Sequence, residues 1–232
     1  MRIAEFENNR SMALMAASMV KKELKKNPTL LLCAATGNSP LPLYKELVSQ
    51  SKKNMGPYRN IRLIALDEWI GLDTSKGSCD AYLRKYLVEP LGISEGRYLG
   101  FNTKANDFRK ESTRMQRQLN QEGPIDLCVL GLGSNGHLGL NEPADILKPH
   151  CHVAQLAPES RKHGMLKEAT SIPTKGLTLG INDILSSKRI LIIISGRGKG
   201  KTKRALFTRK IDPKLPASYL WQHDNVDCLV VQ

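Results

Sequence analysis

Residues 125–143, IDLCVLGLGSNGHLGLNEP, are the stretch that decides the fold. The first six residues are apolar and lack a polar face, which is typical of a strand buried on both sides of a parallel sheet. Glycines follow at positions 131, 133, 136 and 139. Glycines at the carboxyl end of such a strand let the backbone approach a ligand closely, and open α/β sheets bind their substrates there.

The same loop carries polar and ionisable groups. Asn135, His137, Asn141 and Glu142 stand within eight residues of one another, and Pro143 closes the stretch. A lone histidine in a glycine-rich turn would favour a purely structural loop. A buried strand that leads into several glycines and an acid/base cluster instead favours a functional loop.

Chain length and composition indicate one folded domain. We expect residues 1–232 to form a single unit, because an α/β chain of this size can bury a full core. Its 41% hydrophobic and 25% charged residues are ordinary for a globular protein. The formal charge of +13 indicates anionic partners, among which phosphorylated metabolites, nucleic acid and acidic surfaces all remain open.

Cysteine usage and apolar patterning bear on the compartment. The five cysteines are odd in number, have no metal-type spacing and lie mostly in apolar runs, which is typical of reduced, buried thiols. No apolar run approaches the length of a membrane span, and MRIAEFENNR lacks the apolar core of a signal peptide. We therefore expect a cytoplasmic protein with no membrane partner.

Strands and helices alternate along the chain. Apolar runs predict strands at residues 29–35, 61–66, 125–130, 152–156, 189–195 and 226–231. Helical patterns occur at residues 11–26, 41–50, 79–88, 106–121 and 158–167, with a short helical element within 178–186. This alternation predicts an α/β fold, a doubly wound and mostly parallel sheet with helices on both faces.

Two strand ends have the composition of phosphate sites. TGNSP, residues 36–40, lies between a strand and a helix, where free N–H groups and the helix dipole favour an anion, although such turns are also common connections. GRGKGKTKRAL, residues 196–206, follows the most hydrophobic strand. It lacks the Walker spacing, but its glycines and Lys199, a point charge, suit a phosphate monoester.

Two acids, Asp67 and Glu68, stand at the end of another predicted strand. They could cap a helix or form a loop ion pair. Their position at the mouth of a strand predicts that one of them points into the same crevice as His137. Trp69 and His223 are candidates for the wall of that crevice, with core or surface packing favoured for each.

Together, these motifs resemble the glucosamine-6-phosphate deaminase and isomerase family, and within it the galactosamine-6-phosphate isomerase (deaminase) branch. The likeness covers most of the chain through ATGNSPLPLYKEL, LDEWIGL, DLCVLGLGSNGHLGLNEP, LAPESR, GLTLGINDIL and PASYLWQHDN. CHVAQL, HGMLK and PASYLWQH favour the galactosamine branch. The resemblance implies a modified Rossmann-like sheet and a reaction that opens an amino-sugar 6-phosphate ring, isomerises the sugar and releases ammonia.

The resemblance also implies roles for the matching residues. Asp67 corresponds to the general base that moves a proton from the carbon bearing the amine to its neighbour. His137 corresponds to the acid/base group of ring opening, and Glu142 to the acid that holds it. Asn135 stands where some members have Asp, although Asn also occurs there in the family, and its part in an acidic relay is left open. The implied phosphate-binding set is Thr36, Gly37, Ser39, Arg161 and Lys199.

The residue types fit this chemistry without the family name. Abstracting a proton beside a carbonyl or imine needs one positioned carboxylate, worth about 10²–10⁴-fold as a general base. Protonating a ring oxygen near neutral pH suits imidazole, whose free pKa is about 6.5. Neither step needs a metal or redox cofactor, and we expect none, because the adjoining His150, Cys151 and His152 would alternate faces on a strand.

Other functions remain open beside an enzyme acting on a small amino-sugar phosphate. A 6-phosphogluconolactonase-like hydrolase shares the implied fold, but LDEW and the NEP ending oppose it. A non-catalytic sugar-phosphate sensor would bind without turnover. A nucleic-acid partner is not expected, because no recognition helix or aromatic platform is visible. The preferred epimer and the oligomeric state are left open.

Overall fold

The central feature is a parallel sheet with strand order β1-β10-β9-β6-β2-β3-β5. The computed structural model describes residues 1–72, 77–166, 171–196 and 198–232. The strands are β1 Arg2–Phe6, β2 Leu31–Ala34, β3 Arg62–Ala65, β5 Tyr98–Leu99, β6 Leu127–Gly131, β9 Ile190–Ile194 and β10 Val226–Val231. All neighbouring pairs in this sheet run parallel. The predicted mostly parallel α/β sheet is therefore confirmed.

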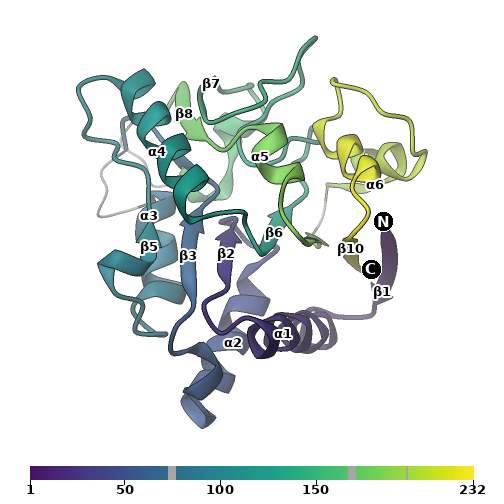
Figure 1. Cartoon of the computed structure of the whole chain (residues 1–232). Helices are drawn as coiled ribbons and strands as arrows, with labels where there is room; N and C mark the ends of the chain where they lie inside the picture. The colour runs from purple at the N-terminus through teal and green to yellow at the C-terminus, as the bar shows by residue number, and fades with distance from the viewer. Residues whose placement is uncertain (73–76, 167–170, 197) are drawn as a thin grey trace.

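Helices cover both faces of the sheet. They are α1 Asn9–Lys26, α2 Leu41–Lys53, α3 Cys79–Leu83, α4 Phe108–Glu122, α5 Ile181–Leu185 and α6 Gly200–Phe207. In Figure 1, α1 and α2 lie on one side of the central strands, and α4 and α5 lie on the other. Because both faces are covered, every residue of β2 and β9 is buried, which explains why these strands read as unbroken apolar runs.

The order of the strands creates a crevice between β2 and β6. From β2 the chain moves outward through β3 and β5, then returns to β6 on the other side of β2 and moves outward again through β9 and β10. The loops that leave β2 and β6 therefore diverge at the carboxyl edge of the sheet. Such a switch point is where open α/β sheets bind ligands.

A second, antiparallel sheet of three strands lies above this edge, with the order β4-β8-β7. Its strands are β4 Asp67–Trp69, β7 His152–Gln155 and β8 Lys175–Thr178. Strands β4 and β8 were not predicted, because three or four residues carry too little periodicity. β1 also escaped prediction, since this exposed edge strand has no buried face.

The helix predicted at residues 158–167 is wrong. The described part of this segment forms two short 3₁₀ turns, Ser160–Lys162 and Gly164–Leu166, and residue 167 lies outside the described residues. His163 between them has an extended backbone, with ψ at 141°. The glycine that follows it also disfavours a continuous helix. The segment is therefore a loop over the carboxyl edge of the sheet.

Two further features of the structure concern the cysteine thiols and the length of the apolar helices. Cys33, Cys79, Cys128 and Cys228 are buried, Cys151 is partly buried, and all five are free thiols. No helix within the described ranges is both long and apolar enough to cross a bilayer.

Candidate active site

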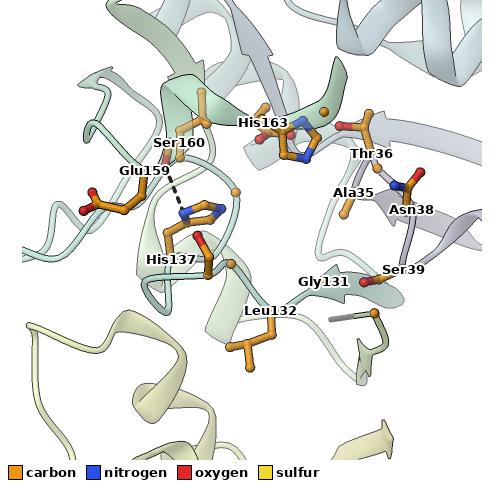
Figure 2. A pocket seen from close by; sticks show the side chains of 18 of the residues that line it. Ala35, Thr36, Asn38, Ser39, Gly131, Leu132, His137, Glu159, Ser160 and His163 are labelled. Atoms are coloured by element: carbon orange, nitrogen blue, oxygen red, sulfur yellow. Dashed lines mark hydrogen bonds between the residues drawn. The ribbon is translucent and has the colours of Figure 1, made fainter. Parts of the chain in front are cut away.

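A cavity of about 390 Å³ opens at the carboxyl ends of β2, β6 and β9. Its walls come from the loops after these strands, from β4 and from residues 159–164 (Figure 2). Six of the predicted site residues line it: Thr36, Gly37, Ser39, Asp67, His137 and Lys199. The expectation that the carboxylate at position 67 and the imidazole at position 137 face one crevice is confirmed.

One end of the cavity is built from the turn between β2 and α2 and from Lys199. Lys199 Nζ donates a hydrogen bond to Ser39 Oγ at 2.8 Å. Among the residues that the structure describes, no carboxylate forms an ion pair with Lys199, and burial lowers its pKa to about 8. A partly buried cation whose side-chain partner among the described residues is a hydroxyl is suited to an anion supplied by a ligand.

Asp67 supplies the carboxylate of the cavity. It is the first residue of β4, it lines the cavity, and it is only 7% exposed. Burial, with a smaller contribution from the neighbouring charge of Glu68, raises its pKa to about 7. A carboxyl group that titrates near neutral pH is a stronger base than an ordinary aspartate and is still substantially ionised.

Glu68 points away from the cavity, because successive side chains of a strand face opposite sides. Its Oε1 accepts hydrogen bonds from the backbone N–H groups of Trp69 at 2.7 Å and Cys79 at 2.9 Å. Its Oε2 accepts one from the N–H of Asp80 at 2.6 Å. Glu68 thus ties β4 to the first turn of α3. Of the interpretations of this acidic pair, the helix cap applies to Glu68 and the crevice carboxylate to Asp67.

His137 is held from its Nδ1 side. Ser160 Oγ lies 3.1 Å from Nδ1, and Figure 2 shows this contact as a dashed line. Glu142 Oε2 lies 3.5 Å from the same nitrogen. Burial would raise the pKa of Glu142, but hydrogen bonds from His137, Ser160 and Asn135 bring it below its usual range. An ionised Glu142 favours a proton on Nδ1, which leaves Nε2 for chemistry in the cavity.

Asn135 supports this pair from behind the cavity wall. Its Nδ2 donates to Glu142 Oε2 at 2.9 Å, and its Oδ1 accepts from the backbone N–H of His137 at 3.2 Å. Neither Asn135 nor Glu142 is among the residues that line the cavity. The amide therefore links the carboxylate to the backbone of the histidine loop, a contact that carries no proton.

The glycine at position 133 lets the His137 ring lie against the backbone. A Cβ atom at Gly133 would stand 2.4 Å from His137 Cδ2, which is closer than real Cβ contacts. The loop can therefore hold the imidazole in this position only if residue 133 has no side chain.

Comparisons with known proteins show the family of the chain. A family model described as glucosamine-6-phosphate isomerases/6-phosphogluconolactonase matches residues 6–229. The chain belongs to this family. It is 36% identical to an Escherichia coli (strain K12) protein named "Putative deaminase AgaI", over 98% of this chain and 91% of the relative. It is 33% identical to glucosamine-6-phosphate deaminase of Bacillus pumilus (strain SAFR-032), over 99% of this chain and 97% of the relative.

Solved structures of the glucosamine-6-phosphate isomerase/6-phosphogluconolactonase family have the same fold. A monomeric glucosamine-6-phosphate deaminase superposes with a TM-score of 0.95 at 31% identity, covering 100% of this chain and 98% of its own. A 6-phosphogluconolactonase from Thermotoga maritima gives a TM-score of 0.77 at 19% identity, covering 99% and 98%. The second likeness shows a shared fold alone.

Arg161, which the family resemblance assigned to phosphate binding, is not among the residues that line the cavity. Its Nε donates to the carbonyl oxygen of Leu156 at 3.1 Å. The neighbouring Lys162 and His163 line the cavity instead. A phosphate-binding role for Arg161 therefore stays a prediction.

Sequence reasoning missed several cavity residues, namely Asn38, Ser160, Lys162 and His163. Three of them belong to the segment that was predicted to be a helix, so their convergence on His137 was not visible. Trp69 lines the cavity, and its ring lies 5.9 Å from that of His163. His223 is not among the lining residues, because its Nε2 bonds to the carbonyl oxygen of Ser187 at 2.7 Å.

Proposed function

We propose that the protein is an amino-sugar 6-phosphate deaminase (isomerase), which converts galactosamine 6-phosphate or glucosamine 6-phosphate to a ketohexose 6-phosphate and ammonia. The observation that carries this proposal is the cavity lined by Asp67, His137 and Lys199. It offers a base, a second acid/base group and a cation that forms no ion pair with the described residues, at a scale suited to one small ligand.

The substrate phosphate binds beside Lys199. This ammonium group, Ser39 Oγ and the turn at residues 36–39 meet at one end of the cavity. The backbone of this turn leads into α2, where the helix dipole favours negative charge. Anchoring the phosphate here leaves the other end of the sugar near the acid/base groups.

Ring opening is assigned to His137. Nε2 of the imidazole takes the proton from the C1 hydroxyl and passes it to the ring oxygen, so that the bond between C1 and the ring oxygen breaks and a free aldehyde forms. The ionised Glu142 and the hydroxyl of Ser160 orient the ring through Nδ1. Nε2 is then the nitrogen that exchanges protons with the substrate.

Isomerisation is assigned to Asp67. Its carboxylate removes the proton from C2, the carbon that bears the protonated amine. The aldehyde oxygen at C1 takes up a proton from this ammonium group as the double bond between C1 and C2 forms, so the product is an enolamine. The same carboxyl group returns the proton to C1, which leaves a protonated imine at C2. Water adds to this imine and ammonia departs. The raised pKa of Asp67 suits both halves of this transfer.

Galactosamine 6-phosphate is the preferred epimer in this proposal. The support is the likeness of CHVAQL, HGMLK and PASYLWQH to the galactosamine branch. We also expect a reducing compartment, the cytoplasm, because the five free cysteines are mostly buried.

The test is Asp67→Asn, with Asp224→Asn on the exposed surface as its matched control. Turnover should fall at least about 10²–10⁴-fold, the contribution of a general base, while sugar-phosphate binding measured by calorimetry persists. The control should keep wild-type ammonia release. Full turnover by Asp67→Asn would exclude Asp67 as the base.

Two assays separate the other candidate functions. A lactonase would hydrolyse 6-phosphogluconolactone and release no ammonia from either amino sugar. A sensor would bind the sugar phosphate and convert neither substrate.

A further inference from the structure

We propose that His163 is a substrate-binding residue that donates a hydrogen bond from Nε2 to the C4 hydroxyl and thereby sets the preference between the two epimers. The inference rests on the proposed function, because it concerns the same cavity. HGMLK, the string that begins at His163, favours the galactosamine branch but assigns no role to this residue, which lies in a segment that sequence periodicity predicted to be helical.

The local hydrogen bonds of His163 determine where its proton sits. Its Nδ1 accepts a hydrogen bond from the backbone N–H of Met165 at 3.3 Å. A backbone N–H can only donate, so Nδ1 is unprotonated and the neutral ring carries its proton on Nε2. Burial, and then the nearby His137 and Lys199, lower the pKa of His163. At neutral pH the ring is therefore an uncharged donor.

His163 lines the cavity, and its Nε2–H group lies beside the turn after β2. Nε2 lies 3.4 Å from the point that a Cβ atom at Gly37 would occupy, so the ring borders the turn after β2. Among the described residues, no protein acceptor bonds to Nε2. Trp69 lies beside the ring with centroids 5.9 Å apart. A partly buried donor without a protein acceptor is suited to a ligand oxygen.

His163 lies between the two ends of the proposed substrate. Figure 2 shows it with His137 and Ser160 on one side and Thr36 and Asn38 on the other. The phosphate on C6 belongs to the end with Lys199, and C1 and C2 belong to the end with Asp67 and His137. A wall residue between these ends faces the middle of the six-carbon chain, and C4 is where the two epimers differ.

A hydrogen bond at C4 would discriminate because only one epimer directs its hydroxyl towards the donor. With the other epimer, the buried N–H is left without an acceptor, which costs about 1–3 kcal/mol, or roughly 5–150-fold in kcat/KM. This effect is larger than a hydrophobic wall gives for two isomers of the same volume.

The experiment measures kcat/KM for both amino-sugar 6-phosphates in the wild type, His163→Phe and His163→Gln. Phe keeps a ring beside Trp69 but removes the donor, so the ratio between epimers should fall at least about fivefold. Gln offers an amide N–H near the position of Nε2 and should restore part of the ratio. His152→Phe is the matched control, because His152 is also partly buried but lies on β7 outside the cavity lining.

The ratio between substrates does not depend on how much of each variant is folded, so a purely structural role would leave it unchanged. An unchanged ratio in His163→Phe, or a wild type that uses both epimers equally, overturns the inference. If the wild type releases no ammonia from either epimer, the proposed function fails instead. Calorimetric affinities of the same variants for the two sugar phosphates then decide the role of His163 separately.

Discussion

Changing the pH titrates two cavity groups whose required charge states are opposite. Asp67 must be ionised to act as the base, and its pKa is raised to about 7 by burial and by Glu68. Lys199 must be protonated to hold the phosphate, and burial lowers its pKa to about 8. The profile of kcat/KM should therefore be a narrow bell, whose two limbs report these groups in the free enzyme.

The two pKa values determine the shape of the bell. At pH 7.5 about three quarters of each group is in its active form, so about 0.6 of the enzyme has both charges in place. Only about a tenth of Asp67 at pH 6, and about a tenth of Lys199 at pH 9, is in the required charge state. At either pH, kcat/KM should therefore be about sixfold lower than at the optimum. Activity is lost on the acidic side because Asp67 is protonated, and on the alkaline side because Lys199 is neutral.

The assay follows ammonia release between pH 6 and pH 9 in the wild type and in Lys199→Arg. A guanidinium stays charged throughout this range, so the alkaline limb should disappear even if the new geometry lowers the whole curve. Lys201→Arg, an exposed position on α6, should keep the bell. An alkaline limb that persists in Lys199→Arg, or a flat wild-type profile, would refute this reasoning.

Two further substitutions test the loop geometry and the sheet. Gly133→Ala should lower kcat at least about tenfold. The added Cβ atom would lie 2.4 Å from His137 Cδ2, so the imidazole ring would have to move. Asp227→Asn should lower the free energy of unfolding by about 2–4 kcal/mol in urea titrations, because Asp227 accepts hydrogen bonds from Arg2 and Arg189. These arginines lower the pKa of Asp227 despite its burial. The difference in the free energy of unfolding between the wild type and Asp227→Asn should therefore be present above about pH 4 and fade below it.

Each substitution has a control of the same kind. Gly96→Ala adds a Cβ with no atom within 4 Å and should leave kcat unchanged. Asp224→Asn removes an exposed carboxylate near β10 and should leave the unfolding midpoint unchanged. Wild-type kcat in Gly133→Ala would contradict the close approach of the ring. Wild-type stability in Asp227→Asn would contradict the structural role of the arginine pairs.

Local sequence was sufficient for the buried part of the fold. Residues 125–130 and 189–195 are apolar runs between glycines or polar turns. β6 overlaps the first run and ends one residue beyond it, and β9 lies within the second. Period and composition act over a few residues, so they identify such strands before any tertiary contact is known. Because the strands are parallel, their carboxyl ends share one edge, which brings Asp67, His137 and Lys199 to one cavity.

Contacts between distant segments decided the finer assignments. The side of β4 on which each acid lies depends on pairing with β8, where Asp67 stands opposite Thr178. Asp67 and Thr178 lie far apart in the sequence, so their pairing leaves no periodic pattern in either segment. The division between Asp67 as cavity carboxylate and Glu68 as cap of α3 therefore required the folded chain.

The loop at residues 159–166 illustrates the same limit. Its composition is compatible with a helix, and only its packing over the carboxyl edge selects two short turns with an extended His163 between them. The sequence by itself determined the buried strands, their ends and the chemical groups attached to them, because these follow from short-range patterns. Tertiary structure alone decided which of those groups face the ligand, because side-chain direction in short strands and loops depends on partners far along the chain.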